Sequence, residues 1–213
     1  MPEADELVVG GLAPMSTCDW PGRLVATVFC QGCPWDCAYC HNPDLIDSRR
    51  AGRVPWSRVR GLLDRRLGLL DGVVFSGGEP TRQPALLPAV REVREAGLAV
   101  GLHTSGAYPT RLAEVLPLVD WVGLDVKGPA ARYDAVTRVA AAADRAFVSL
   151  RLVLEAGVAL QVRTTVDPTV LTPDDVAELR ETLRAMGVTD HVLQEVRTTG
   201  ARPEYVAALG ART

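Results

Sequence analysis

Residues 24–43 read LVATVFCQGCPWDCAYCHNP, an apolar run that passes directly into a loop rich in cysteine. The first seven residues are apolar or β-branched and predict a buried strand. The loop that follows holds four of the chain's five cysteines, Cys30, Cys33, Cys37 and Cys40. Reactive side chains directly after a buried strand are typical of α/β folds, in which chemistry gathers at the carboxyl ends of the strands.

Size and composition favour one domain. With 213 residues and 47% hydrophobic side chains, the chain can bury one sizeable core, and no composition shift indicates a second. We expect a single domain over residues 1–213, made of a lead-in (1–23), the cysteine loop (30–43), the alternating body and a C-terminal tail (198–213).

The same composition limits the environment and the partners. No apolar run approaches the roughly 20 residues of a membrane span, and the acidic start MPEADEL is no export signal. We therefore expect a cytoplasmic protein that binds no membrane and keeps its thiols reduced, which argues against disulfides. A net charge of -3 gives no electrostatic reason to bind nucleic acid.

Apolar runs alternate with helical stretches along the chain. Strands are predicted at 24–30, 72–77, 98–103, 121–127, 159–166 and 191–196, and helices most clearly at 84–97 and 172–187, with a weaker signal at 144–157. This order predicts a parallel sheet covered by helices. Six units are too few for a closed barrel of about 250 residues. We predict an α/β fold, a partial (β/α)6 open TIM-like barrel with parallel strands, over a doubly wound sheet.

The cysteine spacing narrows the kind of site. Zinc sites with four cysteines normally use two C-x2-C pairs a dozen or more residues apart, whereas three residues separate Cys33 from Cys37. The ferredoxin pattern C-x2-C-x2-C-x3-C-P has a different order of spacings. The intact pattern is C-x3-C-x2-C, whose three thiolates suit a 4Fe-4S cube with one iron left open. Cys30 and Cys18 are interpreted as small buried hydrophobes.

The spacing of Cys33, Cys37 and Cys40, with the aromatic Tyr39 before the last cysteine, resembles the signature of the radical S-adenosylmethionine (radical SAM) enzymes. The following His41-Asn42-Pro43 and the upstream DWPGR (19–23) are similar to the branch that activates glycyl radical enzymes, in particular anaerobic ribonucleoside-triphosphate reductase activases. The resemblance covers roughly residues 11–197. It implies that the three cysteines hold a catalytic 4Fe-4S cluster, and that Tyr39 belongs to the cosubstrate site.

The motifs after the next strands fit this resemblance. Gly77 and Gly78 lack Cβ atoms, so a ligand can lie against their backbone, and Glu79 can accept from a cationic amine. The resemblance implies that Gly77, Gly78 and Glu79 hold the amino group of S-adenosylmethionine. The hydroxyls of Thr104 and Ser105 are further candidate contacts. A tight strand-to-helix turn is the alternative for both motifs.

Charged residues follow on the fourth and fifth predicted strands. Asp125 and Lys127 are two apart, so both side chains should point into the strand-end cavity. Lys127 is the one lysine beside 22 arginines, which suggests that a compact ammonium is needed there. The resemblance implies that Asp125 and Lys127 contact the ribose or carboxylate of S-adenosylmethionine. Arg163 should be paired if buried, and is a further candidate contact.

The function implied by the resemblance is reductive cleavage of S-adenosylmethionine to a 5'-deoxyadenosyl radical, which takes a hydrogen from a glycine of a client enzyme. The expected client is anaerobic ribonucleotide reductase, and the expected electron donor is a flavodoxin or ferredoxin. Three alternatives stay open: a small-molecule radical SAM enzyme such as a 7-carboxy-7-deazaguanine synthase-like protein, an electron-transfer iron-sulfur protein and a zinc-stabilised module.

Overall fold

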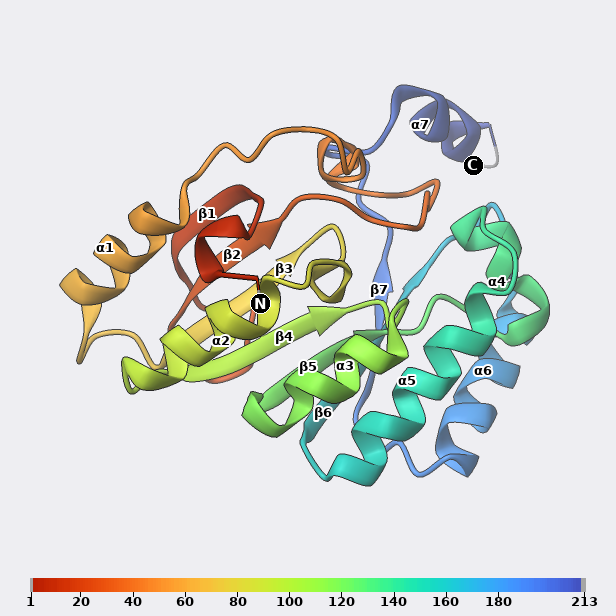
Figure 1. Cartoon of the computed structure of the whole chain (residues 1–213). Coiled ribbons are helices and arrows are strands. Elements are labelled where there is room, and N and C mark those ends of the chain that lie inside the picture. Colours follow the sequence, from red (N-terminus) through yellow and green to blue (C-terminus); the bar gives the residue numbers. More distant parts are fainter. Residues whose placement is uncertain (1, 212–213) are drawn as a thin grey trace.

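The computed structural model describes residues 2–211, and Met1, Arg212 and Thr213 of the predicted lead-in and tail lie outside it. Its sheet has seven strands, which follow one another in chain order (Figure 1). They are β1 (Val9–Ser16), β2 (Val25–Cys30), β3 (Gly72–Gly77), β4 (Ala99–Thr104), β5 (Trp121–Asp125), β6 (Ala159–Val166) and β7 (His191–Glu195). Strands β2 to β7 are parallel, whereas β1 pairs antiparallel with β2. The sheet is open, which confirms the predicted partial barrel.

All six predicted strands are present within one or two residues at each end. The seventh, β1, was missed because its sequence VGGLAPMS contains two glycines and a proline, which are rare inside strands. Such residues are tolerated at a sheet edge, where one side of the strand needs no partner. Two irregularities in its pairing with β2 fall near Gly11 and between Ala13 and Ser16.

The helices are α1 (Trp56–Arg66), α2 (Leu86–Glu95), α3 (Pro109–Val115), α4 (Ala130–Thr137), α5 (Ala142–Ala156), α6 (Pro173–Ala185) and α7 (Pro203–Gly210). The three predicted helices correspond to α2, α6 and α5. The α6 start is a capping box: the Thr172 hydroxyl accepts from the Asp175 N–H, and the Asp175 carboxylate accepts from the Thr172 N–H. These bonds and Arg132 lower the pKa of Asp175 to about 2.

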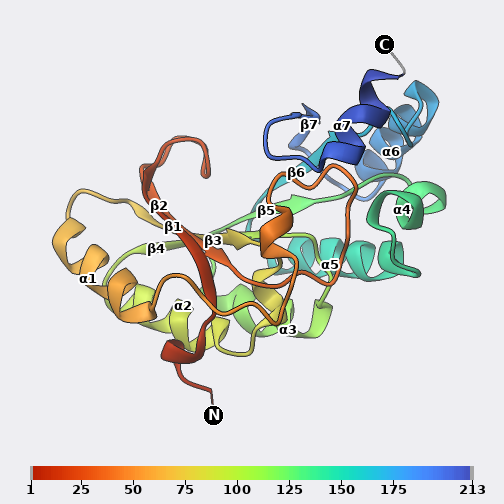
Figure 2. The ribbon, with the colours of Figure 1, turned by 90° about the horizontal axis from the view of Figure 1, so that it is seen from above.

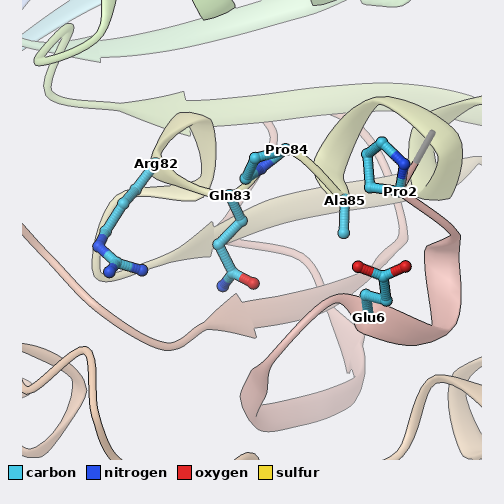
Figure 3. A pocket seen from close by; sticks show the side chains of 6 residues that line it. All are labelled: Pro2, Glu6, Arg82, Gln83, Pro84 and Ala85. Carbon is cyan, nitrogen blue, oxygen red and sulfur yellow. The ribbon is translucent and has the colours of Figure 1, made fainter.

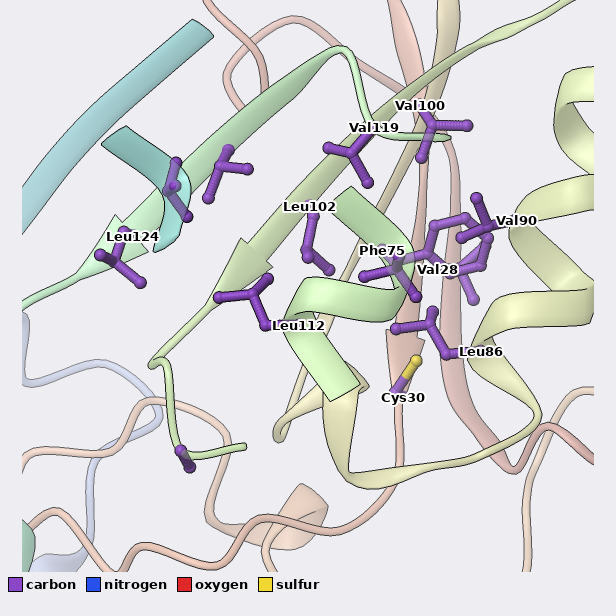
Figure 4. Packing of buried hydrophobic residues seen from close by; sticks show 14 of the residues in the cluster. Val28, Cys30, Phe75, Leu86, Val90, Val100, Leu102, Leu112, Val119 and Leu124 are labelled. Carbon is purple, nitrogen blue, oxygen red and sulfur yellow. The ribbon is translucent and has the colours of Figure 1, made fainter. Parts of the chain in front are cut away.

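Alternation along the strands separates two faces of the sheet. Val28 and Cys30 of β2 point to the face covered by helices, where Cys30 lies in the core with Phe75 and Leu86 (Figure 4). Cys30 has no exposed surface, as predicted for a small hydrophobe. Phe29, between Val28 and Cys30, belongs to the opposite, inner face of the half-barrel.

The inner face is closed at the amino ends of the strands by two tryptophans. Trp20, from the segment before β2, stacks on Trp121 of β5 with ring centroids 5.6 Å apart. They form a separate buried cluster with Val25 and Val74. A Cβ on Gly101 of β4 would lie 2.8 Å from the Trp20 ring, so this glycine makes room for it. The tryptophans fill the inner face at the amino ends of the strands. The polar groups of this face lie at the carboxyl ends.

No helix within residues 2–211 is both long and apolar enough to cross a membrane.

Candidate functional site

The cysteine loop leaves β2 and is held against the end of β3. The Gly78 N–H donates to the Cys30 carbonyl (2.9 Å), and the Glu79 N–H donates to the Gly32 carbonyl (2.9 Å). A Cβ on Gly78 would lie 2.4 Å from the Gly32 oxygen, and one on Gly77 would lie 2.4 Å from the Cys30 nitrogen. Gly77 also has a φ of 112°, in the region that favours glycine. The two glycines therefore allow the loop and the strand end to approach closely.

The three cysteines predicted as cluster ligands lie on this one loop. Cys37 is buried, Cys33 and Cys40 are half-buried, and none of them forms a disulfide. Burial raises the pKa of Cys33 to about 12 and also raises the pKa of Cys37. These thiols stay protonated at neutral pH until a metal binds, because metal binding requires thiolates and releases their protons.

The surroundings of the loop fit an iron-sulfur cluster. Trp35 packs edge-on against Tyr133 (5.6 Å between centroids), and the Lys127 ammonium lies 5.7 Å from the centre of the Tyr39 ring. Trp35 Nε1 and the Tyr39 and Tyr133 hydroxyls are buried without hydrogen-bond partners. Three free thiols enclosed by aromatic rings and unpaired polar atoms suit a cluster, which draws its ligands from cysteine and is tuned by hydrogen bonds to its sulfurs.

A single-ion site is not formed among the described residues. No group of three or more His, Cys, Asp or Glu side chains in residues 2–211 is arranged to hold one metal ion. Zinc holds its four ligands at about 2.0 to 2.3 Å from one centre. Thiolates that bind different irons of a cube are spread more widely. The two kinds of site thus place different demands on the spacing of the same thiols.

Glu79 is fully buried, and hydrogen bonds from the turn after β3 and from the end of β4 occupy its carboxylate. Its Oε1 accepts from the hydroxyls of Thr81 (2.6 Å) and Thr104 (2.7 Å), and its Oε2 accepts from the Ser105 hydroxyl (2.5 Å) and N–H (2.8 Å). The motifs after β3 and β4 are thus brought together, as predicted. In this arrangement Glu79, Thr104 and Ser105 bind one another, and their contacts with S-adenosylmethionine stay predictions.

Three charged residues lie on the inner face: Asp125 at the end of β5, Lys127 just after it, and Arg163 within β6. Asp125 pairs with Lys127 (3.2 Å) and with Arg163 (3.1 Å), as expected for charges two apart on one strand and for a buried arginine. The Lys127 and Arg163 side chains are 12% and 13% exposed, whereas that of Asp125 is 34% exposed. The site therefore has one accessible carboxylate between two cations held in place.

These charges extend across the sheet through His103. Arg163 Nη1 lies 3.2 Å from His103 Nε2, and His103 Nδ1 lies 3.1 Å from the Ser76 hydroxyl. The chain of polar groups runs from β3 to β6 at the level of the strand ends. Ser76 and His103 were not predicted as site residues, although each directly precedes a predicted one, Gly77 and Thr104 respectively.

The network sets the protonation states of its members. Burial alone would raise the pKa of Asp125, but Lys127 and Arg163 outweigh it and hold that pKa below its usual range. Burial would lower the pKa of Lys127, but the Asp125 carboxylate outweighs it and raises that pKa. Burial and the charge of Arg163 lower the pKa of His103 to about 4. At neutral pH the site holds a carboxylate, an ammonium, a guanidinium and a neutral imidazole.

Two hollows lie near the loop. One, of about 430 Å³, is bordered by β1, by Phe29 and by residues 41–45, with Arg53 and Gly200. The other, of about 610 Å³, is open to solvent and is lined by Pro2, Glu6, Arg82, Gln83, Pro84 and Ala85 (Figure 3). The second contains no predicted site residue. The first borders the His41-Asn42-Pro43 motif and the inner face.

The fifth cysteine, Cys18, lies outside the cysteine loop. Cys18 is exposed and lies 3.3 Å from the Ser16 hydroxyl, so its interpretation as a buried hydrophobe is wrong. It follows an edge strand whose outer end faces solvent. Arg60 of α1 pairs with Asp5 (2.5 Å) and Glu92 (2.7 Å).

A sequence model described as the radical SAM superfamily matches residues 27–186. Among curated relatives, a Methanocaldococcus jannaschii protein named as a candidate glycyl-radical enzyme activating enzyme is 27% identical over 184 residues, which are 83% of this chain and 75% of that protein. The pyruvate formate-lyase-activating enzyme of Clostridium pasteurianum is 33% identical over 95 residues, 42% of this chain and 40% of that enzyme.

Solved structures share the fold. The anSMEcpe structure with bound AdoMet superposes with a TM-score of 0.61 at 19% identity, over 78% of this chain and 49% of that one. Streptococcus suis SuiB bound to its precursor peptide SuiA gives 0.63 at 16% identity, over 85% of this chain and 44% of that one. The chain thus spans about half the length of these proteins. It belongs to the radical SAM superfamily, whose enzymes use a 4Fe-4S cluster and S-adenosylmethionine.

Proposed function

We propose that this protein is a glycyl radical enzyme activase, with anaerobic ribonucleoside-triphosphate reductase as its client. The observation that carries the proposal is the relative of the activating-enzyme type, which aligns with 83% of the chain. The sequence His41-Asn42-Pro43 after the last cysteine supports it. Residues 2–211 would form one radical SAM domain, since β1 and α7 pack on the core that residues 27–186 provide.

In the proposed site, Cys33, Cys37 and Cys40 would hold the 4Fe-4S cluster. When bound and reduced by one electron, the cluster supplies the means to cleave S-adenosylmethionine into methionine and a 5'-deoxyadenosyl radical. The backbone at Gly77 and Gly78, with Glu79, would receive the amino group of the cosubstrate, beside Thr104 and Ser105. Thr104 and Ser105 hold the buried Glu79 carboxylate in place at the strand end by hydrogen bonds, and this supports the proposed role.

The inner-face charges would orient the rest of the cosubstrate. Lys127 carries a fixed positive charge suited to a carboxylate, and Asp125 is an exposed acceptor suited to ribose hydroxyls. Arg163 would hold Asp125 in place, and Tyr39 would pack against Lys127. Holding the cosubstrate rigidly places the reacting carbon and excludes water, which is what a radical reaction needs from the protein.

The enzyme would also need a source of electrons and a reducing environment. A flavodoxin or ferredoxin would deliver the electron, and the cytoplasm would provide reducing conditions for the thiols. The client would present one glycine near the inner face. The Cα–H bond of that glycine would break, its hydrogen atom would pass to the 5'-deoxyadenosyl radical to give 5'-deoxyadenosine, and the unpaired electron would stay on the glycine.

The test is anaerobic. The protein is reconstituted with ferrous iron and sulfide, reduced with dithionite and mixed with S-adenosylmethionine and purified anaerobic ribonucleotide reductase. We expect a glycine-centred radical in the electron paramagnetic resonance spectrum and stoichiometric 5'-deoxyadenosine. Cys37→Ala should lose iron and radical, whereas Cys30→Ala, the matched control, should keep both because Cys30 faces the helix-covered core.

Two outcomes would contradict the proposal. 5'-deoxyadenosine that forms only with a small molecule, with no protein radical for any client, would favour the small-molecule alternative. Loss of the cluster in Cys30→Ala would favour a four-cysteine electron-transfer protein.

A further inference from the structure

The segment after β7, residues 197–211, lies against the cysteine loop (Figure 2). His41 Nε2 is 3.2 Å from the Arg197 nitrogen and 3.1 Å from the Arg197 oxygen. Gly200 packs so closely on His41 that a Cβ there would lie 2.6 Å from the His41 oxygen. The Tyr205 hydroxyl donates to Asp167 (2.8 Å) and ties α7 to the loop after β6. The segment is therefore fixed at both ends of its course.

The central contact of this segment with the loop is an ion pair. Arg202 donates to the carboxylate of Asp36, which lies between the ligand candidates Cys33 and Cys37. The Arg202 side chain is 19% exposed, so the pair is partly shielded from solvent. The pKa of Arg202 is raised, chiefly by its hydrogen bond to Asp36, and Cys40 contributes as well. The Arg202 guanidinium is thus close enough to Cys40, the third ligand candidate, to interact with its charge.

A second arginine holds Asp36 from the other side. Arg138 lies 3.6 Å from the Asp36 carboxylate, at the carboxyl end of α4. Its φ is 58°, in the left-handed region where helix ends usually place glycine, so the chain keeps a long cationic side chain at a position that disfavours one. The Asp36 N–H also donates to the Thr137 carbonyl (3.0 Å). The part of the cysteine loop between Cys33 and Cys37 is thus attached, through Asp36, to α4 and to the segment 197–211.

Charge next to an iron-sulfur cluster changes its reduction potential, because reduction adds a negative charge to it. A nearby cation favours the reduced state, and a nearby anion disfavours it. Asp36 and Arg202 stand at the loop with opposite charges, and neither belongs to the cosubstrate network described above.

We infer that Arg202 is a positioning residue for the cluster: through Asp36 it fixes the loop between Cys33 and Cys37, and the two charges together set the potential at which the cluster accepts its electron. The inference rests on the proposed cysteine ligands, but it is independent of the client. The segment 197–211 then contributes to the reaction although it lies outside the region that matches the superfamily.

The test compares Arg202→Gln, Asp36→Asn and the double variant. Each is reconstituted with iron and sulfide and titrated with dithionite and redox mediators, and the reduced cluster is followed by electron paramagnetic resonance. Arg202→Gln removes a cation and leaves Asp36 with one partner fewer, so its midpoint potential should become more negative. Asp36→Asn should make it less negative. The double variant should return close to the wild-type value.

The opposite signs separate this role from a structural one. If the pair merely held the loop, both single variants would shift the potential in the same direction or leave it unchanged, and the inference would be wrong. Arg184→Ala, which breaks an exposed ion pair with Glu181 on α6, is the matched control and should change nothing. Hydrogen exchange of the metal-free protein should also be faster at 197–211 in Arg202→Gln than in the wild type, because the ion pair with Asp36 is lost.

The wild-type protein also separates this inference from the proposed function. A wild type that takes up no cluster would overturn both. A wild type that takes up the cluster and forms no glycyl radical would overturn the activase proposal alone, and the potentials of the variants would still decide the role of Arg202.

Discussion

At the scale of residues, the site combines groups whose ordinary properties are changed by burial. The thiols of Cys33 and Cys37 are held protonated, whereas Lys127 keeps its charge in a nearly buried position because Asp125 pairs with it. Burial keeps His103 neutral, with its Nδ1 3.1 Å from the Ser76 hydroxyl and its Nε2 2.7 Å from the Asp19 carbonyl oxygen. An imidazolium at this place would face a guanidinium about 3 Å away.

The pKa of His103 predicts a pH dependence of stability. It falls from 6.5 to about 4 on folding, so the unfolded chain binds this proton more readily. The free energy of unfolding therefore carries no penalty from His103 above about pH 6.5. It decreases as the pH falls toward 4, by at most about 3 kcal/mol. Urea denaturation of the metal-free protein at several pH values measures it.

The matched variant is His103→Gln, which keeps a polar side chain and cannot titrate. Its stability should change less between pH 6.5 and 4 than that of the wild type. The remaining slope would come from His41 and His191, whose pKa values burial also lowers, and below about pH 5 from carboxyl groups with lowered pKa values such as Glu92 and Asp125. An unchanged slope in the variant would show that His103 is not shifted.

At the scale of elements, the turn after β3 accepts only glycine at position 78 without strain. Gly78→Ala would place a methyl group 2.4 Å from the Gly32 oxygen and 2.8 Å from the Leu45 oxygen, and both are backbone atoms that cannot move cheaply. We expect a loss of about 2–3 kcal/mol in the free energy of unfolding, with reduced iron uptake. Chemical denaturation and iron analysis check this.

Gly61→Ala is the control for this turn. Gly61 lies within α1, where a Cβ would meet only the flexible end of Arg65 at 3.3 Å. This change should stabilise the protein by about 0.5–1 kcal/mol, since alanine favours helix. Equal effects of the two substitutions would mean that the contact with the cysteine loop is not as tight as described.

At the scale of the whole molecule, the half-barrel is closed by a residue from outside the parallel strands. Trp20 precedes β2 and stacks on Trp121 of β5, so the stack joins the segment before β2 to the middle of the sheet across the inner face. Trp20→Ala should cost about 3–5 kcal/mol, and Trp20→Phe clearly less because a ring remains. Met15→Ala, at a residue 55% exposed in the same lead-in, should be nearly neutral.

The measurement is urea denaturation followed by far-ultraviolet circular dichroism and by tryptophan fluorescence. Because the stack links the segment before β2 to β5, three strands further along the sheet, both signals should shift together. A fluorescence transition that moves alone would show that Trp20 stabilises only the lead-in.

The sequence alone determined the six parallel strands and the spacing of the three cysteines. These depend on local patterns: apolar runs of strand length, helix signals between them, and ligands within one loop. It also determined that Asp125 and Lys127 share a face, because alternation along a strand is a local property. The same locality explains why β1 was missed, since its glycines and proline carry no strand signal.

Tertiary structure alone decided which of these residues meet. Glu79 binds Thr104 and Ser105 across two strand ends, His103 joins Ser76 to Arg163, and Arg202 reaches Asp36 from 166 residues away. No local pattern encodes such contacts, because they depend on how the sheet curves and on where the segment after β7 returns. The physical reason is that hydrogen bonds and ion pairs act over a few ångströms in space, whatever the separation along the chain.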